Sequence, residues 1–252
     1  MLLKNVIKNF LNKKNYFFVG DYEAYNRKFT YNIIYLLLFF ILQKKKSLNI
    51  IQVGANDGVI SDPLNKFYKE NKKNITIFFF EPHPDAYLKL KKNLKLYKNF
   101  FFFNKAVGNK GKKYFYFINK KSNKTSSVQD FSGLSGFEKQ NFSKQGLSFD
   151  YKKYISKRLM ELDDIKSIIQ KEIGSKIYSF SNRIDLITID AEGYDDQVIY
   201  NCNIDFFKPS LINFEDKNIS WSRIKKLHIY LNNKNYRLFK WSRTDTIAIK
   251  NN

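Results

Sequence analysis

Two features of the sequence have residue types and spacing that could bind a nucleotide. A turn containing Gly54, Asn56, Asp57 and Gly58 follows a short apolar run, and glycines there let backbone amides come close to a charged ligand. The next apolar run ends in Glu81, where an acidic side chain can accept hydrogen bonds from both hydroxyls of a ribose. Each feature alone also fits an ordinary turn or a solvated strand end. Together they predict a nucleotide-binding crevice.

Three further acids follow later apolar runs. Asp190 and Glu192 stand at alternate positions after one run, and Glu215 ends the next. Acids spaced in this way could share a proton, a metal ion or a substrate hydroxyl, as general-base catalysis requires. The alternative is structural, with Asp190 capping a helix and Glu192 in its first turn. Ligands bind at the carboxyl ends of strands in open parallel sheets, so we expect these acids to rim one crevice with Asp57 and Glu81.

A sheet must position these residues. From residue 49 onward, short apolar runs alternate with amphipathic stretches, which predicts a parallel sheet covered by helices. The seven predicted strands are residues 49–53, 75–80, 100–107, 184–189, 210–214, 236–241 and 246–250. The last two are joined by too few residues for a crossover helix, so we expect that pair to be antiparallel.

The clearest predicted helix covers residues 85–97. Tyr87, Leu90 and Leu94 recur at intervals of three and four residues, while lysines occupy the opposite face. Pro84 suits the first helical position. Between residues 119 and 154 the regular pattern breaks down. Stretches of that length are usually functional or disordered, and we predict an irregular insert that acts as a mobile substrate lid.

The N-terminal part contains an apolar run at residues 29–42, flanked by basic residues. It is shorter than the roughly 20 residues that a transmembrane helix needs, and no cleavage site of a signal peptide follows it. Two interpretations remain: a buried helix that packs on the following domain, or an interfacial helix whose lysines contact anionic lipid. We therefore expect an N-terminal helical extension over residues 1–47 and the main domain over residues 48–252.

Composition excludes several classes of protein. The sequence has 45 Lys and Arg against 23 Asp and Glu, a net charge of +22, which suits a polyanionic partner or reflects compositional drift on a solvated surface. A single cysteine, Cys202, forbids an intramolecular disulfide and favours a reducing cytoplasm. With only two histidines, a Cys/His metal cage cannot form, so any metal would need oxygen ligands. The 43% hydrophobic content argues against disorder.

Five segments of the sequence resemble FkbM-type methyltransferases. They are residues 51–58 (IQVGANDG), 81–84 (EPHP), 106–108 (AVG), 184–194 (IDLITIDAEGY) and 209–215 (PSLINFE), and the resemblance covers roughly residues 49–250. It implies an α/β fold of the Rossmann-like class I methyltransferase type. That fold has a seven-stranded, mostly parallel sheet with a C-terminal antiparallel hairpin and helices on both faces.

The resemblance also implies roles for individual residues. Gly54, Asn56, Asp57 and Gly58 would bind S-adenosylmethionine through its methionine part, and Glu81 would bind its ribose. The backbone of Ala106 and Val107 would lie near its adenine. Asp190, Glu192 and Glu215 would line the acceptor side and supply the catalytic base, or hold Mg²⁺ or Mn²⁺ if a divalent ion is used.

Three positions depart from the family pattern. Gln52 stands where many relatives have an acid, Thr188 where a Lys is common, and Asp216 where His often follows the glutamate. Without that histidine, the base would be a carboxylate or His83.

The resemblance thus implies an S-adenosylmethionine-dependent O-methyltransferase that acts on a hydroxyl of a sugar or glycan precursor, and the single cysteine favours the cytoplasm as its location. Peripheral contact with anionic membrane through residues 1–47 is a further expectation. Two alternatives stay open. An RNA-directed methyltransferase would account for the charge of +22, and a non-catalytic binding module on the same fold would account for the departures.

Overall fold

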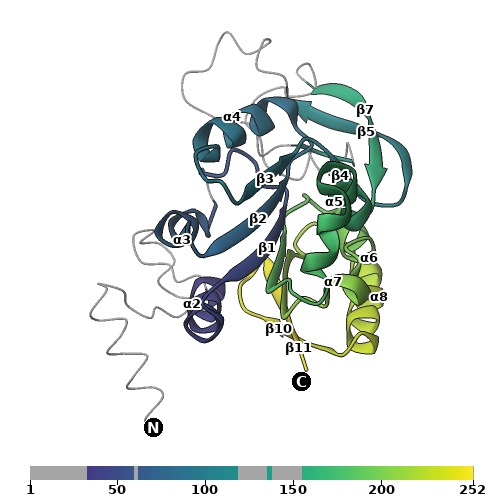
Figure 1. Cartoon of the computed structure of the whole chain (residues 1–252). Helices are drawn as coiled ribbons and strands as arrows, with labels where there is room; N and C mark the ends of the chain where they lie inside the picture. Colours follow the sequence, from purple (N-terminus) through teal and green to yellow (C-terminus); the bar gives the residue numbers. More distant parts are fainter. Residues whose placement is uncertain (1–32, 60–61, 119–134, 138–154, 252) are drawn as a thin grey trace, which may run out of the picture.

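The computed structural model describes residues 33–59, 62–118, 135–137 and 155–251. A central sheet lies between two layers of helices, and a smaller sheet stands beside one of its edges (Figure 1). Residues 1–32 and most of the predicted insert at 119–154 lie outside the described residues.

The main sheet contains the seven strands predicted from the sequence. They are β1 (Leu48–Val53), β2 (Ile75–Phe80), β3 (Phe100–Phe103), β8 (Leu186–Ile189), β9 (Leu211–Glu215), β10 (Tyr236–Lys240) and β11 (Asp245–Lys250), in the order β10-β11-β9-β8-β1-β2-β3. The five strands from β9 to β3 pair in parallel, and β11 is antiparallel to both of its neighbours. The predicted fold class, including the C-terminal antiparallel hairpin, is confirmed.

The strands of this sheet are apolar on both faces because helices cover both. In β2, Phe78 and Phe80 belong to the core on one face of the sheet, and Phe79 to the core on the other. Each stacks on the phenylalanine opposite it in β3, with ring centroids 4.8 to 5.5 Å apart. Continuous phenylalanine runs are therefore what a strand buried on both faces requires.

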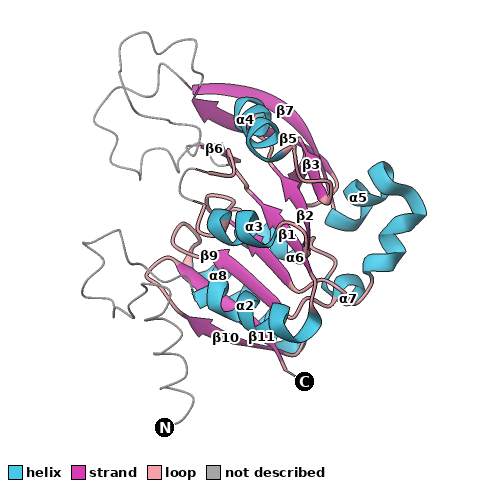
Figure 2. Cartoon of the chain, turned by 60° about the vertical axis from the view of Figure 1, so that its left-hand side comes forward, coloured by secondary structure: helices cyan, strands magenta, loops and turns pink. Residues whose placement is uncertain are grey.

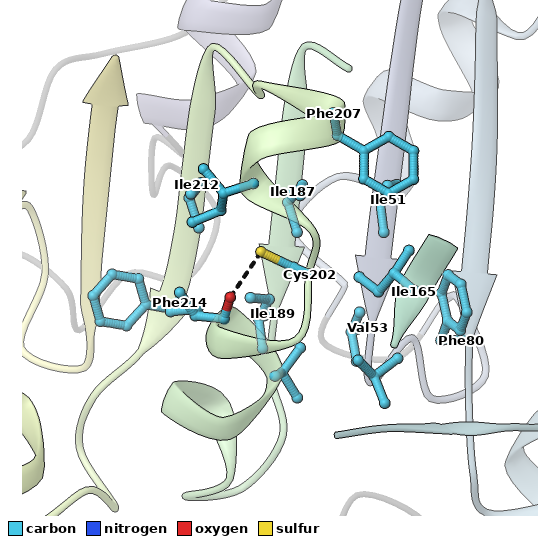
Figure 3. Close-up of a cluster of buried hydrophobic side chains, with 14 of the residues drawn as sticks. Ile51, Val53, Phe80, Ile165, Ile187, Ile189, Cys202, Phe207, Ile212 and Phe214 are labelled. Atoms are coloured by element: carbon cyan, nitrogen blue, oxygen red, sulfur yellow. Dashed lines mark hydrogen bonds between the residues drawn. The ribbon is translucent and has the colours of Figure 1, made fainter. Parts of the chain in front are cut away.

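Four helices pack on one face of the sheet: α5 (Ile165–Ile173), α6 (Asp195–Tyr200), α7 (Ile204–Phe207) and α8 (Trp221–Asn233). A 3-10 helix, η6 (Gly174–Phe180), follows α5 and adds Ile177 to the same core. Figure 3 shows the centre of this core, where Ile51, Ile187 and Ile212 from three neighbouring strands contact the helices. Cys202 is buried here, and its thiol donates a hydrogen bond to the carbonyl oxygen of Ile199 at 3.0 Å.

The helices α2 (Ile33–Lys45), α3 (Asn65–Asn71) and α4 (Pro84–Leu94) cover the opposite face (Figure 2). The apolar run at residues 29–42 forms much of α2, whose Ile34, Leu38 and Leu42 enter the core. None of the helices among the described residues is long and apolar enough to cross a membrane. The helix predicted at residues 85–97 is α4, which ends three residues earlier than expected.

The smaller sheet was not predicted and corrects one strand. Its strands are β4 (Ala106–Val107), β5 (Gly111–Ile118), β6 (Ser135–Gly136) and β7 (Ile155–Asp163), in the order β4-β7-β5-β6. The strand predicted at residues 100–107 is therefore two strands in different sheets. The chain turns at Asn104, whose side-chain amide donates hydrogen bonds to the carbonyl oxygens of Glu81 and Pro82 at 2.8 and 3.2 Å.

Candidate active site

A crevice opens at the carboxyl ends of β1, β2 and β8, where the sequence predicted it. It encloses about 630 Å³, counting its open mouth. The predicted site residues that line it are Gly54, Asn56, Glu81, Ala106, Val107, Asp190 and Glu192. The other three, Asp57, Gly58 and Glu215, are not in its wall.

Gly54 lets two strand ends come together at the floor of the crevice. Its φ angle is +76°, and a Cβ atom here would lie 1.8 Å from the carbonyl oxygen of Asp190. Asn56 also has a positive φ, +49°, and its side-chain oxygen Oδ1 is buried without a hydrogen-bond partner among the described residues. The turn thus brings backbone close to a ligand and leaves a polar atom to be satisfied.

Asp57 and Gly58 hold this turn against α4. The backbone oxygen of Asp57 accepts a hydrogen bond from the side chain of Asn93 at 2.9 Å, and its carboxylate accepts one from the Val59 amide at 2.9 Å. A Cβ at Gly58 would lie 2.6 Å from Leu90 and 2.9 Å from Leu94. The structure therefore places these two predicted cofactor residues behind the crevice, where they support its wall.

Glu81 is held in the crevice by two backbone amides. Its Oε2 accepts a hydrogen bond from the amide of Asn56 and its Oε1 from the amide of His83, both at 2.7 Å. The side chain is 4% exposed, and burial raises its pKa to about 7, with a smaller contribution from the charge of Asp190. Each oxygen keeps a further lone pair, so the fixed carboxylate can accept bonds from two adjacent hydroxyls.

Aromatic side chains form a wall of the crevice near Ala106 and Val107 that the sequence did not reveal. They are Phe115 of β5, Phe137 after β6, and Tyr194. The ring of Phe137 lies 4.8 Å from that of Tyr194 and 5.3 Å from that of Phe115. The ammonium of Lys113 stands 4.5 Å from the centre of the Tyr194 ring. The strands of the smaller sheet bring Phe115 and Phe137 next to Tyr194, and no local pattern in the sequence indicates this contact.

Several acids lie at and beside the other end of the crevice, and their charges affect one another's pKa values. Asp190 is open to the crevice, but the surrounding protein desolvates its carboxylate and, with the charge of Asp245, raises its pKa to about 6. Burial and the charge of Asp190 raise the pKa of Glu215 to about 7. The amide of Asn218 donates to Glu192 at 3.3 Å and to Glu215 at 3.4 Å. Asn218 joins two acids that are distant in sequence, and no pattern pointed to it.

The turn that carries Asp190 and Glu192 is fixed from behind. Glu192 and Gly193 have φ angles of +51° and +91°. Asp195 accepts hydrogen bonds from the amides of Ala191 and Gly193 at 3.3 and 3.2 Å. The helix α6 begins only at Asp195, so Asp190 does not cap it and the structural alternative for this residue is excluded.

Arg223 of α8 fastens the same turn to the helix layer. Its guanidinium donates to the carbonyl oxygen of Gly193 at 3.0 Å and forms an ion pair with the buried carboxylate of Asp196. The chain from Glu215 to Arg223 therefore contacts the turn twice, through Asn218 and through Arg223.

The positions that depart from the family pattern have structural partners. Gln52 accepts a hydrogen bond from the Tyr68 hydroxyl at 2.8 Å. Asp216 pairs with Lys240 and accepts a bond from the Thr246 hydroxyl at 2.7 Å. His83 is buried and caps α4, because its Nδ1 accepts hydrogen bonds from the amides of the next turn. Asp216 and His83 are thus engaged in structural contacts, which leaves the carboxylates of Asp190, Glu192 and Glu215 as the candidates for the base.

A divalent ion is not supported by the geometry. Within residues 33–59, 62–118, 135–137 and 155–251, no group of three or more His, Cys, Asp and Glu side chains is placed to hold a metal ion. Asp190, Glu192 and Glu215 lie near one another without forming such a group.

Comparison with known proteins agrees with the motifs. Residues 52–238 match the family model described as the methyltransferase FkbM domain. No curated protein has a matching sequence.

Similar solved structures include three methyltransferases. One is a putative caffeoyl-CoA O-methyltransferase from Staphylococcus aureus, with 9% identity, TM-score 0.45, and 100% of both chains covered. Another is a Podospora anserina methyltransferase with bound S-adenosylhomocysteine, with 10% identity, TM-score 0.42, and 99% of this chain and 96% of that chain covered. The third is magnesium protoporphyrin IX methyltransferase from Synechocystis PCC 6803 with bound S-adenosylmethionine, with 9% identity, TM-score 0.40, and 87% and 78% covered. Likenesses this distant carry no weight of their own, and the assignment rests on the family model.

Proposed function

This chain belongs to the FkbM family of S-adenosylmethionine-dependent methyltransferases, and we propose that it methylates a hydroxyl of a sugar or glycan precursor. The observation that supports this most is a pair of carboxylates: Asp190, in the wall of the crevice at its acceptor end, and Glu215, which lies beside that end and interacts with Asp190. Their pKa values of about 6 and about 7 suit acceptance of a hydroxyl proton near neutral pH.

The residues of the crevice fit the cofactor. The fixed carboxylate of Glu81 suits the two ribose hydroxyls, and the aromatic wall suits a planar base. The glycine turn and the unpartnered oxygen of Asn56 would face the methionine part. When bound, S-adenosylmethionine supplies a methyl group activated by its attachment to a positively charged sulfur.

The chain's own contribution is to position the acceptor and to remove its proton. Asp190 lies between Gly54 and the other acids, Glu192 and Glu215. Its carboxylate would therefore orient the acceptor hydroxyl toward the cofactor end of the crevice. Glu215 would take the hydroxyl proton, and Asn218 would keep Glu215 and Glu192 in place. Most of the rate enhancement would come from holding the two reactants in line.

The charge of the acceptor end favours a neutral acceptor. Asp190, Glu192, Glu215 and Asp245 lie in this region, and carboxylates repel phosphate while they accept hydrogen bonds from hydroxyls. A neutral polyol therefore fits this end of the crevice better than the phosphate backbone of RNA, although the chain as a whole is strongly basic.

The test is transfer of a labelled methyl group from S-adenosylmethionine to a panel of acceptors. Neutral sugars and oligosaccharides are compared with nucleotide sugars and RNA oligonucleotides, which carry phosphate, and alkali treatment of the product separates a stable ether from a labile ester. We expect an alkali-stable product on a sugar and loss of transfer in Asp190→Asn and Glu215→Gln. Transfer to RNA alone would contradict the proposal. Binding of S-adenosylhomocysteine without transfer to any acceptor would point to the non-catalytic module.

A further inference from the structure

Over residues 33–42 the helix α2 carries apolar or aromatic side chains on all sides, although only one side is fully buried in the core. Ile34, Leu38 and Leu42 are buried, whereas Ile33 and Phe40 are 38% and 41% exposed. Leu36 stands on the same outer side as these two, at helical spacing, and does not belong to the core. We call Ile33, Leu36 and Phe40 the outer stripe of α2. An amphipathic helix that only had to pack on the sheet would carry polar residues at these positions.

The helix α4, on the far side of α3, also carries an exposed apolar residue on its outer side. Its buried residues are Ala86, Leu90 and Leu94, and on its outer side Leu88 is 64% exposed between lysines. Leu96, just beyond the helix, is 83% exposed. Figures 1 and 2 show α2, α3 and α4 on the same side of the main sheet, so the helices that carry these exposed residues form one outer layer of the molecule.

That layer is also densely basic. Its exposed lysines include Lys69, Lys72, Lys91, Lys92, Lys95 and Lys98. Over the described residues between 33 and 100, Glu70 is the one exposed acidic residue, and the other acids are buried or partly buried. Aliphatic protrusions surrounded by lysines are what a surface needs in order to insert into lipid and attract anionic headgroups at the same time.

We propose that the outer layer of α2, α3 and α4 is a docking face for an anionic membrane surface. The outer stripe of α2 and Leu88 would enter the boundary between headgroups and acyl chains, and the lysines would contact the lipid phosphates. This inference does not rest on the proposed function, since it uses none of the crevice residues. It extends the membrane contact expected for residues 1–47, which include α2, to a broader, folded surface.

RNA is the less suitable partner for this face. Binding of single strands without sequence preference relies on aromatic platforms in a groove, and the exposed apolar residues here are mostly aliphatic. A helix layer whose exposed apolar residues are mostly leucine and isoleucine offers RNA mainly phosphate contacts, whereas lipid can use these apolar side chains as well.

The experiment is sedimentation of the full chain with vesicles of phosphatidylcholine and phosphatidylglycerol, compared with vesicles of phosphatidylcholine alone. Neutralising three lysines, in K69Q/K92Q/K95Q, should weaken binding to the anionic vesicles about 100-fold, because each lysine near such a surface contributes about fivefold. Phe40→Ser and Leu88→Ser should each weaken it about tenfold or more. Unchanged thermal unfolding midpoints would show that the variants remain folded.

Matched controls lie on the opposite helix layer. K208Q/K225Q/K226Q makes the same change in net charge, and Ile229→Ser removes a similarly exposed aliphatic residue from α8. Both should bind like the wild type. Equal losses in the controls would overturn the proposal in favour of general attraction by the net charge. Absence of binding by the full chain would also overturn it. Loss of RNA binding instead of vesicle binding in the test variants would identify the face as a nucleic-acid surface.

Discussion

At the scale of single residues, the site is defined by carboxyl groups in and beside the crevice. Burial and the repulsion between their charges raise their pKa values to near neutral pH. The pKa values of Glu81, Asp190 and Glu215 are raised to about 7, 6 and 7. Glu81 is fixed by two backbone amides, while Glu215 shares the amide of Asn218 with Glu192. Similar pKa values thus arise in two different settings, one suited to holding a ligand and one to exchanging a proton.

The role of Glu215 as a base predicts the pH dependence of activity. A base must be deprotonated to act, so kcat/KM should rise as the pH increases through about 7. Glu215→Gln should lower kcat about 100-fold or more. Initial rates measured across this range provide the test. The exposed Glu161 gives a control, because E161Q should keep the wild-type profile. A flat wild-type profile would rule out a titrating carboxylate base.

Glu81 also predicts how stability without ligand depends on pH. Its folded-state pKa of about 7 lies above the ordinary value of 4.5, so the folded protein holds this proton more tightly than the unfolded chain does. The free energy of unfolding should therefore fall as the pH rises from about 4.5 to about 7, by on the order of 3 kcal/mol from this group alone. Urea unfolding at several pH values should show a weaker fall in Glu81→Ala. Identical slopes in the two proteins would mean that Glu81 titrates normally.

At the scale of elements, the site depends on the close approach of β1 and β8 and on a turn fastened to α8. Gly54 allows the first contact, because its missing side chain makes room for the carbonyl of Asp190. Arg223 and Asp195 hold the turn that carries Glu192. Asp195 accepts hydrogen bonds from two amides of this turn, and Arg223 donates one to the carbonyl of Gly193. Residues outside the crevice therefore decide where its acids stand.

The contact at Gly54 can be tested with a paired substitution. Gly54→Ala combines an unfavourable φ of +76° with a Cβ placed 1.8 Å from a backbone oxygen, so either β1 or β8 must move. Gly174→Ala has a comparable φ of +58°, but no atom lies within 4 Å of its added Cβ. We expect Gly54→Ala to reduce the free energy of unfolding by at least about 2 kcal/mol more than Gly174→Ala. Chemical denaturation measures both, and equal effects would show that the strands separate easily.

Arg223 tests the fastening of the turn. Arg223→Lys keeps a positive charge near Asp196 but cannot reach Asp196 and the Gly193 carbonyl together, so kcat should fall while most of the stability remains. Arg223→Leu leaves a buried carboxylate unpaired and should destabilise the fold by about 3–5 kcal/mol. Steady-state kinetics and thermal unfolding separate the two effects. Full kcat in the lysine variant would show that the turn needs no such support.

At the scale of the whole molecule, the sequence revealed the parts whose signals are local. The central strands of the main sheet are buried on both faces and stand out as apolar runs, and Gly54 and Glu81 directly follow two of them. The smaller sheet escaped prediction because β5 and β7 are half exposed and pair residues from the two sides of a long insert. Phe115 and Phe137 enter the crevice only through that pairing, and Asn218 meets Glu192 only through the packing of the chain around α8.

The most direct test of the account is calorimetric binding of S-adenosylhomocysteine to the wild type, Glu81→Ala and the control Glu161→Ala. Of the two substitutions, only Glu81→Ala removes hydrogen-bond acceptors from the crevice. Hydrogen bonds to a charged acceptor contribute about 1.5–3 kcal/mol each. We predict binding by the wild type and Glu161→Ala, and an affinity at least about tenfold lower in Glu81→Ala. Equal affinity in all three proteins would contradict the placement of the cofactor, and absence of binding by the wild type would contradict its use.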